Sequence, residues 1–524
     1  MKCFNVTGVC VPHKHYMADM SGKIAEIKSL VEQEKYFTIN RARQYGKTTT
    51  LFLLKKELLA SYIPISISFE GLDDESFESP EAFCKVFINL ITKALKFTAA
   101  TAEYIDEWED YSVVNFNLLS NHITKMCHGK KVVLMIDEVD KISNNRTFLH
   151  FLGMLRNKFL SREVDEDFTF HSVILAGVYD IKNIKLKMIN EGTYIQAASE
   201  TKIYNSPWNI AVNFKVTMSF NPNEIAVMLS DYEKDHNTGM DITAISKELY
   251  RNTEGYPFLV SRICQCIDEE LEKNWTITGI LNAINIILQE KDLLFDDLKK
   301  NIENNNDVYN FLYDILIVGE KKSFNIYTPV IELCSMYGYI KNRSGYASIS
   351  NKIFEIWMAN YFISKDANAG RLENAICSGL LQKIVNGGKF DMELCIRKFA
   401  EHYTELFSES DAKFLERHGR LLFLSYLKPL INGHGFYHME SQFTDLRRMD
   451  IIVDFGREQF IIELKLWHGE KYKQEAYKQL IDYMNSKNAE VGYLLTFDFR
   501  KNTNKQTQAE WVIIDGKRIF DVVV

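Results

Sequence analysis

The sequence lacks an apolar run long enough to cross a membrane. No uninterrupted apolar stretch approaches the roughly 20 residues that a transmembrane helix requires. The chain begins MKCFNVTGVCVPHKHYMADM, which also lacks the apolar core of a secretory signal peptide. We therefore expect a cytoplasmic protein that is not associated with a membrane.

Paired cysteines are missing as well. The nine cysteines are scattered along the chain, and none belongs to a CxxC array. A disulfide framework or a structural zinc site is therefore not expected. The nearest approach to a metal cluster is Cys10 with His13 and His15, which lacks the second half-site that tetrahedral zinc requires.

The third absence is an excess of basic residues. The formal net charge of -8 excludes a protein that coats nucleic acid with its whole surface, but it is compatible with a local basic groove. What the chain does have is length and apolar content. Its 524 residues predict about two or three domains. A composition of 46% hydrophobic and 25% charged residues is that of a folded globular protein.

The N-terminal part alternates helical periodicity with short apolar runs. This alternation predicts buried parallel strands separated by helices, and hence an α/β domain of the P-loop NTPase type at residues 1–220. The expected strands are YFTIN, IPISISF, KVVLMIDEV and SVILAGV. In residues 221–302 apolar residues recur at helical spacing, which predicts a helical lid.

Two further regions follow. Residues 303–365 carry helical patterns and then two strand-like runs around the turn signal NRSG, which predicts a winged-helix subdomain. The small polar stretch KDANAGR at 365–371 predicts a linker. Residues 371–524 predict a second α/β domain, whose expected strands are GFYHMESQF, RMDIIVDF, QFIIELKLW and, as the last one, VGYLLTF.

The stretch RARQYGKTT at 41–49 stands between an apolar strand and a helix-forming segment. This is the context of a phosphate loop, in which backbone N–H groups and a helix N-terminus hold phosphates, a lysine reaches the terminal phosphates and a hydroxyl binds Mg²⁺. Gly46, Lys47 and Thr48 fill these places, although Arg41 stands where the full pattern has a glycine. The predicted ATP-binding residues of the loop are Arg43, Gln44, Tyr45, Gly46, Lys47, Thr48 and Thr49.

A second element supports a nucleotide site. Asp137 and Glu138 end the apolar run KVVLMIDEV, the place where P-loop enzymes hold Mg²⁺ and polarise the attacking water. We predict that Asp137 and Thr48 are metal ligands and that Glu138 is the general base of ATP hydrolysis. The alternative is a buried strand that merely ends in solvated carboxylates.

These motifs together resemble the bacterial AAA-ATPase-like proteins, relatives of the AAA and STAND-type P-loop ATPases that are often joined to a PD-(D/E)XK nuclease-like domain. The resemblance covers nearly the whole chain. It is carried by FNVTGVCVPHKHYMAD, YFTINRARQYGKTT, VVLMIDEVD, ILAGVYDIKNI, SPWNIA and EGYPFLV. The first loop of this family commonly has arginines where the glycine would be, as Arg41 does here.

The resemblance also implies roles for residues outside the loop. His15, Tyr16 and Met17 would lie near the nucleotide base. Asp180 would lie near the sensor position after the fourth strand, and Pro257 near the adenine. Tyr16 and Met17 fit equally well as core residues, and Pro257 fits as the first residue of a helix.

In the C-terminal region charged residues interrupt two apolar strands. Asp450 lies in RMDIIVDF, and Glu463 and Lys465 lie in QFIIELKLW. Because side chains alternate along a strand, Glu463 and Lys465 share one face. Carboxylates hold Mg²⁺ or Mn²⁺ against a scissile phosphate, and a lysine orients water and stabilises the developing charge. A solvated strand face is the usual alternative for such a pattern.

The order of these elements resembles the PD-(D/E)XK nuclease fold. In that fold Asp450, Glu463 and Lys465 would be catalytic, and the two carboxylates would be metal ligands. Gln479, followed one turn later by Tyr483, looks like the polar helix residue that several members of the superfamily place at the metal site. The resemblance therefore implies a catalytic role for Gln479.

The position of a further acid is open. Glu440, on the preceding strand, is a candidate metal ligand, and an exposed edge glutamate is the alternative reading of this residue. The acid could instead come from Glu401 or Glu405 on an earlier helix.

Two functions of different classes remain. The first is an ATP-hydrolysing protein coupled to a Mg²⁺-dependent nuclease, for which DNA is favoured over RNA as substrate. We expect this protein to form a homo-oligomer. By analogy of architecture, we also expect a role in defence against mobile DNA. The second is a nucleotide-gated scaffold or signalling switch whose C-terminal domain is catalytically silent. A helicase is disfavoured because no additional helicase motif follows the second P-loop element.

Overall fold

The structure, a computed structural model, describes residues 2–98, 100–139, 145–178, 208–318, 320–368, 384–386, 389–406, 416–431, 435–441, 449–456, 458–467, 469–498 and 508–524. It divides into two compact units. Unit 1 comprises Met1–Lys273 and Ile326–Tyr339, and unit 2 comprises Asn274–Asn325 and Ile340–Val524. The finer domain boundaries expected from the sequence stay a prediction. No helix within the described ranges has both the length and the apolar content that a membrane span needs.

Unit 1 is built on a parallel sheet of four strands in the order β1-β4-β3-β2. The strands are β1 (Phe37–Asn40), β2 (Ile63–Ser68), β3 (Val132–Asp137) and β4 (Ser172–Gly177). Each lies in one of the four apolar runs that were expected to form strands. Every residue of β3 and β4 is buried, as befits central strands covered on both faces. At the sheet edge, Val212 forms a parallel bridge with Phe37 of β1.

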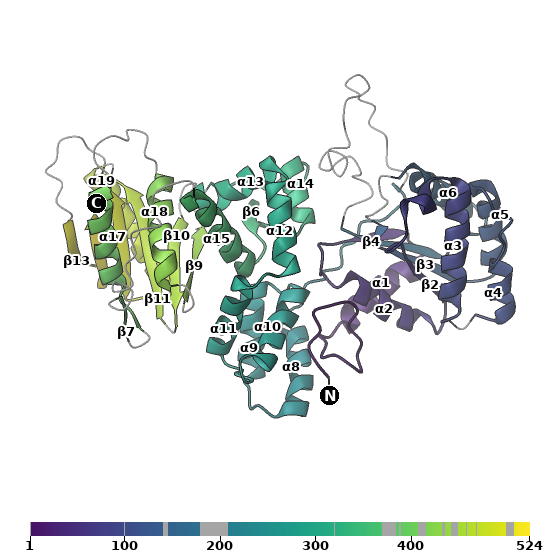
Figure 1. Ribbon diagram of the computed structural model, residues 1–524, viewed down its shortest axis with the longest axis horizontal. Helices are drawn as coiled ribbons and strands as arrows, with labels where there is room; N and C mark the ends of the chain where they lie inside the picture. The colour runs from purple at the N-terminus through teal and green to yellow at the C-terminus, as the bar shows by residue number, and fades with distance from the viewer. Residues whose placement is uncertain are drawn as a thin grey trace, which may run out of the picture. The chain divides into compact units, whose positions relative to one another are not determined.

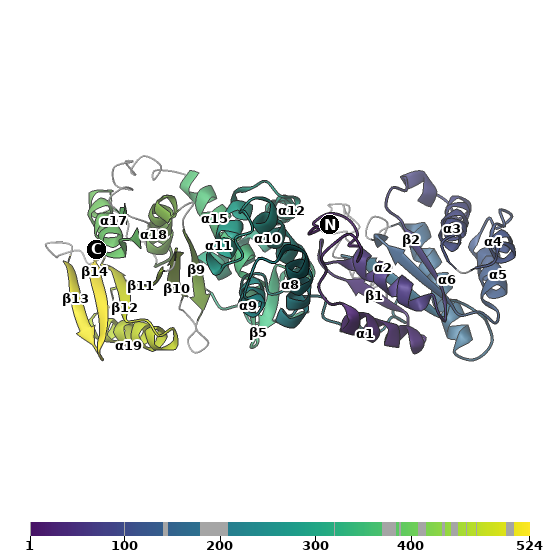
Figure 2. The ribbon, with the colours of Figure 1, turned by 90° about the horizontal axis from the view of Figure 1, so that it is seen from below.

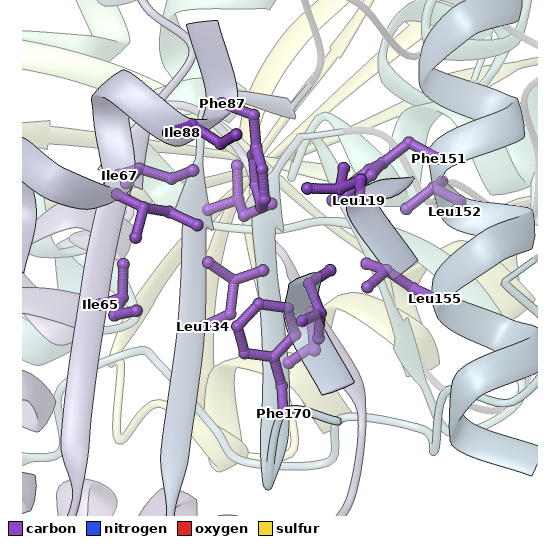
Figure 3. Close-up of a cluster of buried hydrophobic side chains, with 14 of the residues drawn as sticks. Ile65, Ile67, Phe87, Ile88, Leu119, Leu134, Phe151, Leu152, Leu155 and Phe170 are labelled. Carbon is purple, nitrogen blue, oxygen red and sulfur yellow. The ribbon is translucent and has the colours of Figure 1, made fainter. Parts of the chain in front are cut away.

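Helices cover both faces of this sheet (Figure 1). On one face lie α1 (Ser21–Glu32) and α2 (Lys47–Leu58), and on the other lie α3 (Pro80–Leu95), α5 (Phe116–Cys127) and α6 (Arg146–Arg162). Two shorter helices, η1 (Asp74–Phe77) and α4 (Ala102–Trp108), flank α3. Along β3, Val133 packs with α1 and α2, whereas Leu134 packs with Phe87 and Phe151 in the cluster of Figure 3. This alternation places apolar side chains on both faces of the sheet.

Three helices continue unit 1 in the region expected to be a lid. They are α8 (Pro222–His236), α9 (Ile242–Thr253) and α10 (Pro257–Glu269). α8 begins at a capping box, in which the side chain of Asn221 accepts from the N–H of Glu224 and the side chain of Glu224 accepts from the N–H of Asn221. A helix from much later in the chain, α14 (Pro329–Met336), also belongs to unit 1.

Gly255 joins α9 to α10 at a place that excludes any side chain. Its φ is 73°, in the left-handed region that favours glycine. Its carbonyl accepts a hydrogen bond of 2.8 Å from the N–H of Phe220. A β-carbon at Gly255 would lie 1.8 Å from the carbonyl oxygen of Phe220. The close approach of these two backbones therefore explains the glycine of the EGYP motif.

The first part of unit 2 is helical and includes a hairpin. Its elements are α11 (Ile277–Gln289), α12 (Leu293–Glu303), α13 (Asn306–Tyr313), the π-helix η4 (Asp314–Val318), β5 (Ile340–Arg343), β6 (Tyr346–Ile349) and α15 (Lys352–Asn368). β5 and β6 pair antiparallel, and the turn residues Ser344 and Gly345 have φ values of 52° and 87°. Positive φ at both residues is the geometry of a tight two-residue hairpin turn. The strand-like runs around NRSG thus form this hairpin.

The rest of unit 2 is a mixed sheet of six strands in the order β13-β14-β12-β11-β10-β9. The strands are β9 (Gly435–Ser441), β10 (Met449–Phe455), β11 (Glu458–Leu466), β12 (Val491–Phe497), β13 (Gln508–Ile514) and β14 (Lys517–Val523). α17 (Met392–Leu406) and α18 (Glu416–Ile431) cover one face, and α19 (Glu470–Ser486) covers the other (Figure 2). The small pair β7 (Val385–Asn386) and β8 (Lys389–Phe390) precedes α17. Leu480 and Met484 of α19 pack with Leu494 and Ile519 of the sheet.

The expectation that VGYLLTF is the last strand is wrong, because β13 and β14 follow it. β14 pairs parallel to β12 and antiparallel to β13. The turn between them is Asp515–Gly516, with φ values of 50° and 77°, and this dipeptide is a strong hairpin signal. The signal is easy to overlook because β13 is only half-buried and mixes apolar with polar residues.

We expect Gly255→Ala to destabilise unit 1 strongly, because the new methyl group collides with backbone that cannot move aside. The expected loss in free energy of unfolding exceeds about 2 kcal/mol. Gly239→Ala is the matched control, since Gly239 has a similar φ of 74° but a β-carbon there would have no atom within 4 Å. It should cost only the backbone term of about 1 kcal/mol. Chemical denaturation of both variants measures the difference, and equal losses would contradict the steric argument.

Candidate functional site

The loop between β1 and α2 has the backbone of a phosphate-binding turn. Gly46 adopts φ 76° and ψ 18° and is the N-cap of α2, which starts at Lys47. Gln44 also has a positive φ of 56°. Left-handed residues that alternate with right-handed ones turn backbone N–H groups into a concave surface, here at a helix N-terminus where the helix dipole favours an anion. The loop is therefore shaped to receive phosphate.

Lys47 lies inside this loop. Its Nζ donates hydrogen bonds of 3.0 Å to the carbonyl oxygens of Arg41 and Ala42. The side chain is buried, so the ammonium group is held against the loop rather than in solvent. A bound phosphate would compete with these two carbonyls for the same group.

Arg41 replaces the first glycine of the usual loop and anchors it. Its guanidinium donates to the carbonyl oxygens of Asn40 and Val216, the latter at 2.9 Å, and lies 5.1 Å above the ring of Phe214. Burial lowers the pKa of Arg41. The arginine thus fastens the start of the loop to the segment beside β1, which is a structural reason for a large residue at this position.

The hydroxyl of Thr48 and the carboxylate of Asp137 lie together at the end of β3. Thr48 Oγ1 donates to Asp137 Oδ2 at 2.7 Å. The N–H of Glu138 donates to the other carboxylate oxygen, Oδ1, at 3.0 Å. A hydroxyl and a carboxylate are the hard oxygen ligands that Mg²⁺ prefers, so this pair fits the ion predicted for it. Glu138 has a φ of 55°, a conformation that a non-glycine residue adopts at a cost in free energy.

The lid helices touch the loop through Tyr256, the residue before Pro257. The hydroxyl of Tyr256 donates to the carbonyl oxygen of Arg43 at 2.5 Å. Its ring meets that of Tyr45 edge to face at 4.6 Å, and the Tyr45 hydroxyl lies 2.7 Å from Ser219 Oγ. Burial raises the pKa of the Tyr45 hydroxyl. Pro257 itself is buried at the first position of α10, consistent with its reading as a helix start.

The N-terminal segment also reaches the loop. The N–H of Cys10 donates to Thr49 Oγ1 at 3.1 Å. His15 is fixed by its Nδ1, which accepts from the N–H of Val11 at 2.9 Å, and burial lowers its pKa. These contacts bring the segment to the start of α2, although a role of His15 at the nucleotide base stays a prediction.

Tyr16 lies in an aromatic cluster with Phe4 and Tyr232, with ring centroids 5.1 and 5.2 Å away. Its hydroxyl donates to Asp235 of α8 at 2.8 Å. Tyr16 therefore ties the N-terminal segment to the lid, and contact with a base stays a prediction for it. Met17 is half-buried beside it, and Asp180 lies outside the described residues.

In unit 2 the predicted acids fall into one row across the sheet. Asp450 of β10 is paired with Glu440 of β9. Ile451 is paired with Ile462 of β11, and this register continued by one residue sets Asp450 opposite Glu463. Because opposite residues of neighbouring strands share a face, the three acids belong to the same face. The structure describes the backbone of Glu440 and Asp450, so their assignment to this face rests on the strand register alone.

Glu463 forms an ion pair with Lys465 on that face, in which the carboxylate is buried and the lysine is half-buried. Glu463 is 1% exposed, and its Oε1 lies 2.5 Å from Lys465 Nζ. Ile461, on the same face of β11, packs in the cluster with α19, so the pair belongs to the face that this helix covers. Burying a carboxylate is costly unless an opposite charge accompanies it. Glu463 therefore does not belong to a solvated strand face.

α19 adds two polar groups. The Oε1 atom of Gln479 and the hydroxyl of Tyr483 are buried, and neither has a hydrogen-bond partner among the described residues. Buried polar atoms usually have a partner, so such atoms indicate a place for water, an ion or a ligand. Glu401, by contrast, is exposed on α17, which covers the opposite face of the sheet (Figure 2). Glu405 belongs to the same helix, and the structure describes its backbone. Gln479 is thus the predicted residue best placed to join the acids.

Carboxylate and amide oxygens form a donor set that suits Mg²⁺ or Mn²⁺. Among the side chains that the structure describes, no group of three or more His, Cys, Asp or Glu residues is arranged to hold a metal. Glu440 and Asp450 are not among those side chains. The chemistry of Glu463 and Gln479 therefore fits a metal, and the full set of ligands stays a prediction.

A second acid–lysine pair under α19 was not predicted. Asp521 of β14 lies 2.7 Å from Lys473 Nζ and accepts a hydrogen bond from the hydroxyl of Tyr477. Two signals could have found it. A single carboxylate interrupts the apolar run IFDVVV, and a lysine and a tyrosine stand one turn apart in the preceding helix.

Comparisons with known proteins agree with this arrangement. The family model described as AAA-like domain matches residues 11–360. The model described as PD-(D/E)XK nuclease superfamily matches residues 436–508, a range that contains the acid row, Lys465 and Gln479. No curated protein matches the chain.

Among solved structures, a Walker-type ATPase of Pyrococcus abyssi is 12% identical, with a TM-score of 0.48, and the match covers 68% of this chain and 99% of that one. The ORC2 protein of Aeropyrum pernix, in its ADPNP–ADP complexes, is 9% identical, with a TM-score of 0.39 and coverage of 69% and 97%. The first family model matches well over half of the chain. The chain therefore belongs to the AAA-like domain family, and its C-terminal part is a domain of the PD-(D/E)XK nuclease superfamily.

Proposed function

We propose that this protein binds and hydrolyses ATP with Mg²⁺ and that its nucleotide state controls a metal-dependent nuclease, with DNA favoured over RNA as substrate. The observation that carries the proposal is the ion pair of the buried Glu463 with Lys465, in register with Asp450 and Glu440 on one face of the sheet. In a catalytically silent domain, apolar residues of similar volume could often replace these charges without loss of stability.

At the nucleotide site, Lys47 would exchange the carbonyl oxygens that it now contacts for the terminal phosphates of ATP. Thr48 and Asp137, already joined by a hydrogen bond, would hold Mg²⁺ next to those phosphates. Glu138 follows Asp137 directly and would orient the attacking water as general base. Arg43, Gln44 and Tyr45 would contribute the N–H groups of the loop.

At the nuclease site, Glu463, Asp450 and Glu440 would hold Mg²⁺ or Mn²⁺. A bound divalent ion supplies Lewis-acid stabilisation of the scissile phosphate and lowers the pKa of bound water. Lys465 would orient the water and stabilise the charge that develops on the phosphate. Gln479 would direct its amide oxygen to the same place, since that atom is buried and has no partner among the described residues.

The coupling between the two activities would pass through α14. Gly338, at the end of this helix, packs on the phosphate loop: a β-carbon there would lie 3.0 Å from Cβ of Ala42 and 4.0 Å from the ring of Tyr256. Ala42 is also a residue whose carbonyl Lys47 must release when phosphate binds. The chain then continues from Tyr339 into β5 of unit 2. Nucleotide binding would therefore alter a contact that lies two residues before the second unit.

The hairpin of β5 and β6 supplies the wing of the winged-helix subdomain that the proposal keeps, and this subdomain would act as part of the switch. The sequence of α14, PVIELCSM, is apolar and acidic rather than basic, which disfavours a helix that reads a nucleic-acid groove.

The proposal extends, by architecture alone, to a cytoplasmic bacterial protein that assembles as a homo-oligomer and acts in defence against mobile DNA. The nucleotide base would lie near His15, Tyr16 and Pro257, between the N-terminal segment and the lid.

We expect Lys47→Ala to abolish ATP hydrolysis, with a loss of about 100-fold or more, because the terminal phosphates lose their cation. Lys56→Ala on the same helix is the control, since Lys56 is exposed and lies over the ring of Phe52. Release of inorganic phosphate by the purified proteins measures the effect. Hydrolysis at the wild-type rate in Lys47→Ala would exclude this loop as the ATP site.

We expect the wild-type protein to cut plasmid DNA with Mg²⁺ or Mn²⁺, at a rate that changes when ATP is added. Lys465→Ala and Glu463→Gln should each reduce cutting by about 100-fold or more while ATP hydrolysis persists. Lys478→Ala, at an exposed position of α19, is the control and should cut normally. Single-stranded DNA and RNA tested in parallel decide the substrate. Intact ATP hydrolysis without cutting of any of these nucleic acids would favour the scaffold instead.

A further inference from the structure

The second acid–lysine pair has the properties of a clamp on α19. Asp521 is 2% exposed, its Oδ2 lies 2.7 Å from Lys473 Nζ, and the same oxygen accepts from the Tyr477 hydroxyl. Lys473 and Tyr477 stand one turn apart and therefore project from the same stripe of the helix. One carboxylate of the sheet thus holds one stripe of α19 at two points.

This clamp lies in the same row as the proposed nuclease acids. Asp521 is paired with Leu494 of β12, and Leu494 is paired with Glu463 of β11. All three therefore share a face, and Glu463 and Asp521 are separated by two strand spacings, or roughly 10 Å. The lysine of the clamp also lies near the end of β11, because its Nζ is 5.9 Å from the ring of Trp467, the residue that follows this strand. α19 consequently covers two acid–lysine pairs at once.

The clamp and the polar groups of the nuclease site lie on different flanks of α19. Gln479 follows Tyr477 by two residues, which corresponds to a rotation of about 200° around the helix axis. Tyr483 follows Gln479 by one turn and shares its flank. The flank of Tyr477 is bound to β14, so the flank of Gln479 is turned towards β11 and β10, on which Ile461 and Ile452 pack with this helix. A rotation of α19 would therefore move Gln479 directly.

Stability alone does not account for this arrangement. Removing two charges from water offsets much of the attraction between them, so apolar residues of similar volume often replace a buried ion pair without loss of stability. What an ion pair with fixed geometry does provide is one defined orientation. The requirement for a defined orientation arises where a helix presents a group to a reacting centre, because small displacements there reduce rates strongly.

We propose that Asp521, with Lys473 and Tyr477, forms a positioning clamp that sets the rotation of α19 and thereby places Gln479 over the acid row of the nuclease site. The inference rests on the proposed nuclease function. None of the three residues is required to touch the nucleic acid or the metal. They act through Gln479.

A double-mutant cycle tests the clamp. We expect Asp521→Asn, which keeps the volume of the side chain, to lower kcat for DNA cutting about 10-fold with little change in KM. Gln479→Ala alone should cost at least as much. In the Gln479→Ala background, Asp521→Asn should cost nothing further, because the group that it positions is already gone. Additive losses, or an unchanged kcat in Asp521→Asn, would overturn the proposal.

Two further variants separate positioning from folding. Tyr477→Phe removes one of the two ties without changing packing, and it should lower kcat by a smaller factor while thermal unfolding stays close to wild type. Lys473→Arg preserves the charge and should retain most of the activity, whereas Lys473→Met should behave as Asp521→Asn. A loss of thermal stability with unchanged kcat in the whole set would assign these residues a structural role only.

Binding of Mn²⁺, followed by electron paramagnetic resonance on the full chain without ATP, supplies a readout that does not depend on cutting. The affinity should fall several-fold in Asp521→Asn and in Gln479→Ala, no further in the double variant, and not at all in Lys478→Ala. If the wild type binds Mn²⁺ with this pattern but cuts no nucleic acid, the proposed nuclease function fails and the clamp stands. If the wild type cuts and Asp521→Asn matches it in both assays, the clamp fails and the nuclease stands.

Discussion

The burial of charged side chains on strands is the constraint on which both candidate sites of this protein depend. A carboxylate removed from water costs free energy unless a hydrogen-bond donor or a cation lies next to it. Asp137 is met by Thr48 of α2, Glu463 by Lys465, and Asp521 by Lys473 of α19. The contacts of Asp137 and Asp521 hold α2 and α19 against their sheets, whereas Lys465 lies on the same strand as Glu463.

The phosphate loop is likewise held by polar side chains. Lys47, Arg41 and Tyr256 all bind main-chain carbonyl oxygens of the loop or of the strand before it. The loop is consequently held by the strand edge, the helix that follows and the lid. Gly338 adds a fourth neighbour from α14. A ligand that displaces Lys47 from these carbonyls would change a region in which distant parts of unit 1 meet, and this would be the physical basis of the proposed nucleotide-dependent switch.

Local patterns predicted the elements well where hydrophobic periodicity was strong. The four strands of unit 1 and β9 to β12 of unit 2 follow from short apolar runs bounded by polar turns, because burial on both faces selects such runs. The pairing of Glu463 with Lys465 also follows from alternation along one strand. The hairpin of β13 and β14 was not predicted, because β13 is half-buried and its hydrophobic alternation is weak. The dipeptide Asp515–Gly516 nevertheless marks the turn.

The sequence by itself determined the chemical inventory: a GKT loop, an acid after a buried strand, and a D…ExK pattern followed by Gln479. Only the tertiary structure decided which of these groups meet. The row that joins Glu440, Asp450 and Glu463 depends on strand register, which is a long-range property. The approach of Gly338 to the loop and of Asp521 to Lys473 joins segments far apart in the chain, and no local spacing encodes such a contact. Periodicity specifies the faces of elements, whereas packing selects the partners of those faces.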